Sequence, residues 1–236
     1  GRSHPHDSAC AQVAGAAPYI DDLPEVKGTL YAAPILSSQA HGRIERIDTS
    51  AASSLPGVHA VVLHADIPGQ AMLAIFTADE PIFAHNTVEY VGQVIGLVVA
   101  DNPMLARRAA RQVAVEITPL PANLSIEQAL ASASAVLPPV TVRRGDAAAA
   151  LARAPHTLSG TLEVGGQEHF YLESQIAYAL PQEQNQWLIH SSTQHPGEVQ
   201  HWVAHALGVD NHAVRVECRR LGGGFGERTC AAPLAK

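Results

Sequence analysis

The sequence predicts a mixed α/β (α+β) fold in two domains, and three observations lead to that class. Residues 88–117 contain a buried strand, a helix and a second strand in succession, a spacing typical of α/β units. A helix between strands is expected again at 196–208. The 236 residues are 47 % hydrophobic and only 16 % charged, which provides enough apolar material for a core.

The first elements follow an irregular segment, residues 1–25. "GTLYAAPIL" (28–36) predicts a strand, and 43–69 predicts a strand, a short helix, a turn and a second strand. Asp48 or Thr49 is placed to cap that helix.

The clearest pattern lies in residues 88–117. "VIGLVVA" (94–100) predicts a buried strand, and "MLARRAARQV" (104–113) predicts a helix. Asn102 and Pro103 supply an N-cap and a proline at the first helical position, and "VAVEI" (113–117) predicts the next strand.

A Pro-containing connector predicts a domain boundary between about 118 and 142, which divides the chain into residues 1–120 and 121–236. Ser125 with Gln128, and separately Asp146, are placed to cap short helices. The remaining expected elements are strands at 158–165, 175–181, 186–192 and 213–219, and a helix at 196–208 with Gly208 as its C-terminal cap.

Composition argues against several function classes. The net charge is −7 with both signs spread along the chain, so nucleic-acid binding has no electrostatic basis. No apolar run reaches the ~20 residues that cross a bilayer, and the polar N-terminus shows no signal peptide. Cys10, Cys218 and Cys230 have no zinc, iron–sulfur or disulfide spacing, so a cytoplasmic location is expected.

Two histidines, His201 and His205, stand four residues apart on the helix expected at 196–208. The pattern HExxH is absent, and both fall opposite the apolar stripe of that helix. A solvated helix face is therefore favoured over a metal site.

Neutral hydrogen-bond donors are concentrated in three loops. Gln167 lies in "GGQEHFYLESQ", where Glu168 or Glu173 is placed to brace the loop; Gln194 precedes a helix N-terminus. The glycine-rich stretch 222–226 offers bare main-chain amides, but it lacks the P-loop pattern and has Glu227 where GxGxxG needs glycine. Such donors suit an anionic, oxygen-rich ligand that approaches the main chain closely.

These motifs resemble a known family. "GQEHFYLE" (166–173) followed by "RRLGGGFG" (219–226), with "VEYVGQVIGLVVAD" and "STQHP", is similar to the molybdenum hydroxylases, and most of all to the molybdopterin-binding large subunit of bacterial xanthine dehydrogenases. The resemblance implies a hammerhead α/β domain followed by the beginning of a molybdopterin-binding domain. It further implies hydroxylation of a purine such as hypoxanthine or xanthine with oxygen from water.

The resemblance also implies site residues. Gln167 and Phe225 match positions beside the molybdenum, and Gly224, Gly226 and Gln194 match cofactor contacts. The family motif G-K-E-T after the glycines is replaced by "ERTC". The substrate-orienting glutamate therefore falls at Thr229 by direct count, or at Glu227 if the register shifts.

The remaining expectations concern partners and activity. The family pairs this subunit with one that carries 2Fe-2S clusters and FAD, passes electrons to NAD, and forms a heterotetramer. Its general-base glutamate is expected beyond Lys236, so residues 1–236 alone are not expected to turn over substrate. Two alternatives are open: a hydroxylase of aldehydes or other aza-heterocycles, or a non-catalytic fragment that docks the iron–sulfur/FAD partner.

Overall fold

The computed structural model describes residues 1–74 and 78–225, which form two compact units. The first unit combines residues 1–120 with residues 170 onward, and the second is 121–169. In the first unit the strands are β1 (Tyr31–Leu36), β2 (Gly42–Asp48), β3 (Val58–Leu63), β4 (Met72–Ala74), β5 (Ala78–Pro81), β6 (Thr87–Val88), β7 (Val94–Ala100), β8 (Ala114–Pro119), β9 (Ala177–Pro181), β10 (Trp187–Ser191) and β11 (Val214–Glu217).

The α-helices are α1 (Ala9–Val13), α2 (Ser50–Ser53), α3 (Pro103–Ala110) and α6 (Pro196–Leu207) in the first unit, and α4 (Ile126–Ala131) and α5 (Ala147–Arg153) in the second. Single-turn 3-10 helices occur at η1 (Ile20–Asp22), η2 (His64–Asp66), η3 (Glu183–Asn185) and η4 (Asn211–Ala213). Within the described ranges, no helix is long and apolar enough to span a bilayer.

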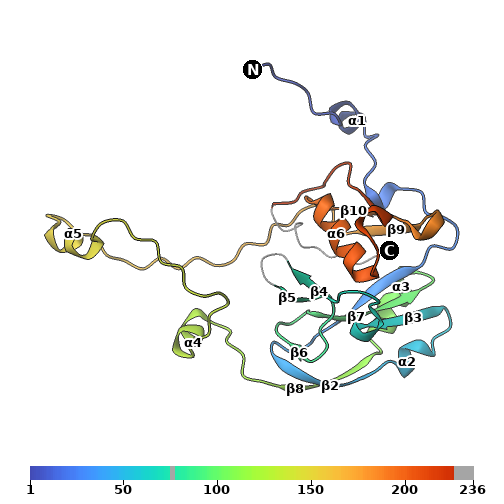
Figure 1. The fold of residues 1–236 in the computed structure, drawn as a ribbon, viewed down its shortest axis with the longest axis horizontal. Helices are drawn as coiled ribbons and strands as arrows, with labels where there is room; N and C mark the ends of the chain where they lie inside the picture. The colour runs from blue at the N-terminus through green and yellow to red at the C-terminus, as the bar shows by residue number, and fades with distance from the viewer. Residues whose placement is uncertain (75–77, 226–236) are drawn as a thin grey trace. The chain divides into compact units, whose positions relative to one another are not determined.

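The larger core of the first unit lies between the antiparallel sheet β1-β7-β3 and α3 (Figure 1). The central strand β7 buries Ile95 and Val98 completely, and α3 buries Ala106 and Ala109 against them. Small alanines let the helix approach the sheet closely, which explains why a chain poor in aromatics still packs a core. A second antiparallel sheet, β6-β2-β8, contributes Ile44 and Ile117 to the same core.

The local signals for α3 are confirmed. The Asn102 side chain accepts a hydrogen bond of 2.9 Å from the Leu105 amide, and Pro103 occupies the first turn. The strands on either side of α3 join different sheets, because β7 pairs with β1 and β3 whereas β8 pairs with β2.

The strands β9, β10 and β11 form the sheet that leads to the glycine-rich stretch. β9 and β10 are antiparallel neighbours, whereas β10 and β11 are parallel and α6 connects them. α6 packs on this sheet by burying Val199, Trp202 and Ala204, and it ends at Gly208 in the left-handed conformation (φ 67°). The predicted cap at Gly208 is thus confirmed.

Several expected elements differ in the structure. The residues 158–165 form no strand; the Leu158, Leu162 and Val164 side chains are all largely exposed. A strand needs a hydrogen-bonding neighbour, and none pairs with this segment among the described residues. The N-terminal residues 1–25, which were expected to be irregular, contain α1 and η1.

At α2 the N-cap residue is Thr49, but its side chain makes no capping bond. The carboxylate of Asp48 accepts from the Ser50 amide at 3.0 Å instead. In the second unit, Ser125 accepts from the Gln128 amide and Asp146 from the Ala149 amide, as predicted.

Candidate functional site

The glycine loop, residues 221–225, is held against residues 171–173 by hydrogen bonds on both sides of Gly222. The carbonyl oxygen of Gly222 accepts from the amides of Leu172 (3.1 Å) and Glu173 (3.3 Å). The amide of Gly222 donates to Oε2 of Glu173 at 2.9 Å. Glu173 therefore braces the glycine loop, whereas the sequence had suggested Glu168 or Glu173 as a brace of their own loop at 165–175.

Close packing explains why residues 222 to 224 are glycines. A Cβ added to Gly222 would overlap the Cβ of Glu173 and lie 3.0 Å from its amide nitrogen. On Gly223, which has a φ of +114°, it would lie 2.6 Å from the Cβ of Tyr171. Real Cβ atoms do not approach heavy atoms this closely, so any side chain here would move the loop or its neighbours.

Gly224 faces Gln194, which the sequence also assigned to the cofactor. A Cβ on Gly224 would lie 2.8 Å from both Cδ and Oε1 of the Gln194 carboxamide. Gln194 is exposed and follows the buried Ser192 and Thr193, and Thr193 Oγ1 accepts from the His195 amide at 3.0 Å. The structure thus brings Gly224 and Gln194 into contact from segments far apart in sequence.

Phe225 has a backbone in the left-handed region (φ 54°), and its side chain is 69 % exposed. For a residue other than glycine this conformation costs roughly 1–2 kcal/mol, so the surrounding loop must impose it. Gly226 and Glu227, which the sequence also selected, lie outside the described residues.

Gln167 belongs to the second unit. Its side chain is exposed, and its Nε2 donates to the carbonyl oxygen of Glu168 at 3.5 Å. Its assignment beside the metal stays a prediction.

Arg220 ties the start of the glycine loop to the N-terminal segment. Its guanidinium lies 3.3 and 3.4 Å from the Ser8 hydroxyl and donates to the carbonyl oxygen of Pro18. Sequence reasoning did not find this contact, because the partners are separated by 212 and 202 residues and no local pattern marks them.

The solvated helix face expected at the two helical histidines is found at His201 but only in part at His205. His201 is exposed and His205 half-buried, with ring centroids 3.9 Å apart. Throughout 1–74 and 78–225, no group of three or more His, Cys, Asp or Glu side chains could hold a metal ion.

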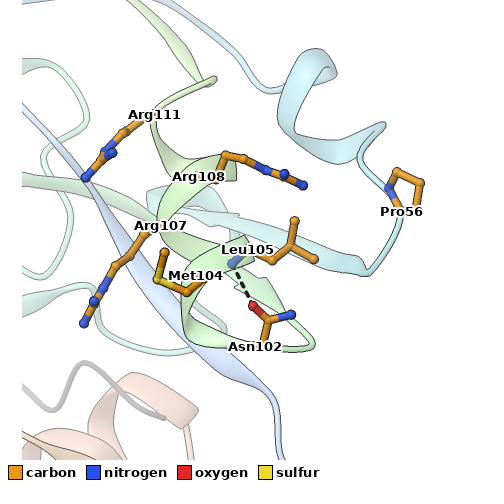
Figure 2. Close-up of a pocket in the computed structure, with 7 residues that line it drawn as sticks. All are labelled: Pro56, Asn102, Met104, Leu105, Arg107, Arg108 and Arg111. Carbon is orange, nitrogen blue, oxygen red and sulfur yellow. Dashed lines mark hydrogen bonds between the residues drawn. The ribbon is translucent and has the colours of Figure 1, made fainter.

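An open hollow of about 570 Å³ lies elsewhere on the first unit, beside α3 (Figure 2). Arg108 and Leu105 extend toward Pro56, whereas Arg107 and Arg111 leave the other side of the helix. The net charge had not suggested this cluster of arginines. None of the predicted site residues that the structure describes lines the hollow.

Comparison with known proteins matches both parts of the chain. Residues 14–121 match the a/b hammerhead domain of aldehyde oxidase and xanthine dehydrogenase, and residues 131–235 match the molybdopterin cofactor-binding domain. Together these matches show that the chain belongs to the molybdenum hydroxylase family of xanthine dehydrogenase and aldehyde oxidase.

Individual relatives agree with this placement. Xanthine dehydrogenase of Drosophila subobscura is 43 % identical over 230 residues, which cover 96 % of this chain and 17 % of the relative. Xanthine dehydrogenase/oxidase of Mus musculus is 39 % identical over 235 residues, 99 % of this chain and 18 % of the relative. The chain therefore spans less than a fifth of the length of these relatives.

Solved structures show the same fold. Aldehyde oxidoreductase from Desulfovibrio gigas superposes with a TM-score of 0.80 at 30 % identity, over 94 % of this chain and 27 % of that one. Quinoline 2-oxidoreductase from Pseudomonas putida 86 gives 0.82 at 29 % identity, over 97 % and 31 %. The predicted hammerhead domain followed by the start of a molybdopterin-binding domain is confirmed.

The geometry of the glycine loop fits a molybdopterin cofactor. In the described part of the chain, the amides of Gly223 and Gly224 donate to no protein acceptor. Gly224 lies beside the exposed Gln194 carboxamide, and the main chain carries no side chain at either glycine. Neutral donors of this kind suit the oxygen-rich, anionic parts of that cofactor.

Proposed function

We propose that the protein carrying this chain is a molybdenum-dependent oxidoreductase that hydroxylates purines, converting hypoxanthine to xanthine and xanthine to urate. The observation that carries the proposal is the glycine loop within a matched molybdopterin-binding domain: Gly224 packs against Gln194, and the amides of Gly223 and Gly224 donate to no acceptor in the described part of the chain. The xanthine dehydrogenases among the relatives support the purine substrate. When bound, the molybdenum–molybdopterin group supplies the two-electron oxidising centre.

The residues of this chain would hold and orient that group. The amides of Gly224 and Gly226 and the carboxamide of Gln194 would donate to its oxygens, and Gln167 and Phe225 would stand nearest the metal. Donors fixed in advance stabilise negative charge without reorganising during reaction. Glu227 is the proposed substrate contact. We assign no catalytic base within residues 1–236.

We further propose that the protein works with an iron–sulfur and FAD-containing partner in a cytoplasmic heterotetramer that reduces NAD. The family to which the chain belongs is the support for this partner and assembly. The partner would receive the electrons taken from the substrate.

The test is metal analysis and turnover of the protein expressed from its complete coding region together with its partner. We expect close to one molybdenum per chain and formation of urate from xanthine. Bound molybdenum with turnover of an aldehyde or of quinoline would instead favour the hydroxylases represented by the two structural neighbours. Absence of molybdenum would contradict the proposal and favour a docking role.

A matched pair of variants tests the site itself. Gly224→Ala drives a methyl group into the Gln194 carboxamide, whereas Gly197→Ala, in the first turn of α6, enters open space. We expect the first to lower the molybdenum content several-fold and the second to leave it unchanged. Equal molybdenum in both variants would contradict the assignment of Gly224.

A further inference from the structure

We infer that Glu173 is the positioning residue of the glycine loop: its carboxylate fixes the direction in which the amides of Gly223 and Gly224 point. The inference rests on the proposed function, because it assigns a role toward the cofactor that this loop would hold. Glu173 would act through the main chain and would not itself touch the cofactor.

Glu173 holds Gly222 through both its side chain and its main chain. Its Oε2 accepts from the Gly222 amide at 2.9 Å, while its own amide donates to the Gly222 carbonyl at 3.3 Å. The two bonds fix the peptide groups before and after the Cα of Gly222. A single bond would leave the loop free to rotate about that residue.

Close packing restricts the backbone of the next two residues, Gly223 and Gly224. Gly223 stands against the Cβ of Tyr171 in a backbone conformation with φ +114°. Gly224 meets the Gln194 carboxamide. With Gly222 fixed and these two contacts made, the amides of Gly223 and Gly224 have set directions before any ligand binds. This order in advance reduces the entropic cost of binding.

The charge of the Glu173 carboxylate strengthens its hydrogen bond to the loop. Glu173 is half-buried, and an amide that donates to a carboxylate forms a hydrogen bond about twice as strong as a neutral one. A glutamine in the same place keeps one oxygen as acceptor but loses the charge. An alanine removes the acceptor altogether, while the backbone bonds of residues 172 and 173 to Gly222 stay available.

Amide hydrogen exchange of the cofactor-free protein tests the contact directly. In Glu173→Ala we expect the Gly222 amide to exchange at least about tenfold faster than in the parent, since a hydrogen bond to a charged group is lost. Glu173→Gln should fall between the two. Glu183→Ala, which removes an exposed carboxylate in η3, is the control and should leave this amide unchanged.

Molybdenum content, measured on the monodisperse folded fraction, tests the consequence. We expect Glu173→Ala to retain at least about fivefold less molybdenum than the parent, with partial rescue by Glu173→Gln, since about 1 kcal/mol changes occupancy by roughly that factor. Unchanged exchange at Gly222 would overturn the inference. Faster exchange at Gly222 in Glu173→Ala with full retention of molybdenum would also overturn it. An equal loss of molybdenum in Glu173→Gln and Glu173→Ala would overturn it as well.

The two proposals fail in distinguishable ways. If the parent protein itself binds no molybdenum, the proposed function fails, and the exchange data still decide whether Glu173 sets the loop. If Glu173→Ala yields no folded fraction, Glu173→Gln alone decides. Parent-like exchange at Gly222 together with parent-like molybdenum content overturns the inference. Faster exchange at Gly222 together with less molybdenum supports it.

Discussion

At the scale of single residues, the stacked pair His64 and His85 shows how one environment changes a titration. Their ring centroids lie 3.8 Å apart with planes inclined by 14°. Burial, and then the charge of His64, lower the pKa of His85 below its ordinary value of 6.5. In the unfolded chain both influences disappear, so the unfolded state binds a proton more readily at this position.

The resulting prediction concerns pH. The folded state disfavours the charged form of His85, so the pKa of His85 is lower in the folded state than in the unfolded state. The stability that depends on neutral His85 is therefore complete well above pH 6.5. It is lost as the pH falls through the pKa of the unfolded state toward the lower pKa of the folded state. We expect the free energy of unfolding, measured with urea between pH 8 and pH 5, to fall less steeply in His85→Asn than in the parent. His156→Asn, at an exposed histidine, is the control; parallel pH profiles for the parent and His85→Asn would refute the prediction.

Residue-scale features were predictable wherever their partners are local. Asn102, Asp146 and Gly208 act on atoms only a few residues away, and the sequence alone predicted all three caps. The hydrogen bond of Glu173 to Gly222 spans 49 residues, and that of Arg220 to Ser8 spans 212. Such contacts depend on how distant segments fold together, and no nearby residue pattern encodes them.

At the scale of elements, α6 is held at its C-terminal end by residues from outside the helix. Its first turn follows Gln194 and His195, and its last carbonyls are capped from outside the helix. The amide of Gly69 donates to the Ala206 carbonyl at 2.9 Å, and that of Gln70 donates to the His205 carbonyl at 2.8 Å. The loop before β4 thus satisfies acceptors that a helix end leaves open.

Gly69 is therefore a sensitive position for α6. A Cβ at residue 69 would overlap the carbonyl oxygen of His205 and lie 2.6 Å from the amide nitrogen of Gly208. We expect Gly69→Ala to lower the free energy of unfolding by about 1–3 kcal/mol, the usual cost of overpacking. Gly197→Ala, on the same helix, has open space and should be neutral or slightly stabilising. The measurement is the free energy of unfolding of Gly69→Ala and Gly197→Ala in denaturant. Similar unfolding midpoints for the two variants would show that the loop before β4 moves aside at no cost in stability, against the prediction.

Element-scale prediction failed where alternation of apolar residues was the only signal. Residues 158–165 read as a strand, yet no segment between 1 and 74 or between 78 and 225 pairs with them, whereas β9 and β10 pair through five positions. The local sequence pattern indicates that a segment can adopt strand conformation. A strand forms only when a neighbouring strand completes its backbone hydrogen bonds.

At the scale of the whole molecule, apolar burial is uneven. One core surrounds β7 and α3, and a smaller one lies between α6 and the sheet of β10 and β11. The unit 121–169 contributes no residue to either core, and its Leu158 and Leu162 are 101 % and 87 % exposed. Large exposed apolar side chains close in sequence are a surface that other apolar groups can bind.

This exposure makes a prediction for the isolated chain. Replacing Leu158, Leu162 and Val164 by serine should reduce the binding of an apolar fluorescent dye severalfold, because these side chains are accessible. The free energy of unfolding should change by less than about 0.5 kcal/mol, as expected for surface positions. A large loss of stability would show that these residues are packed, and Val142→Ser, at another exposed position, is the control.

The parallel pairing of β10 with β11 has a kinetic consequence. β9 and β10 can pair as soon as the short connection between them closes. β11 can pair with β10 only after the crossover through α6 has formed. The glycine loop is the continuation of β11, so its geometry is established late in folding. An assembly factor that delivers a ligand to this loop would therefore meet a chain in which most of the sheet is already built.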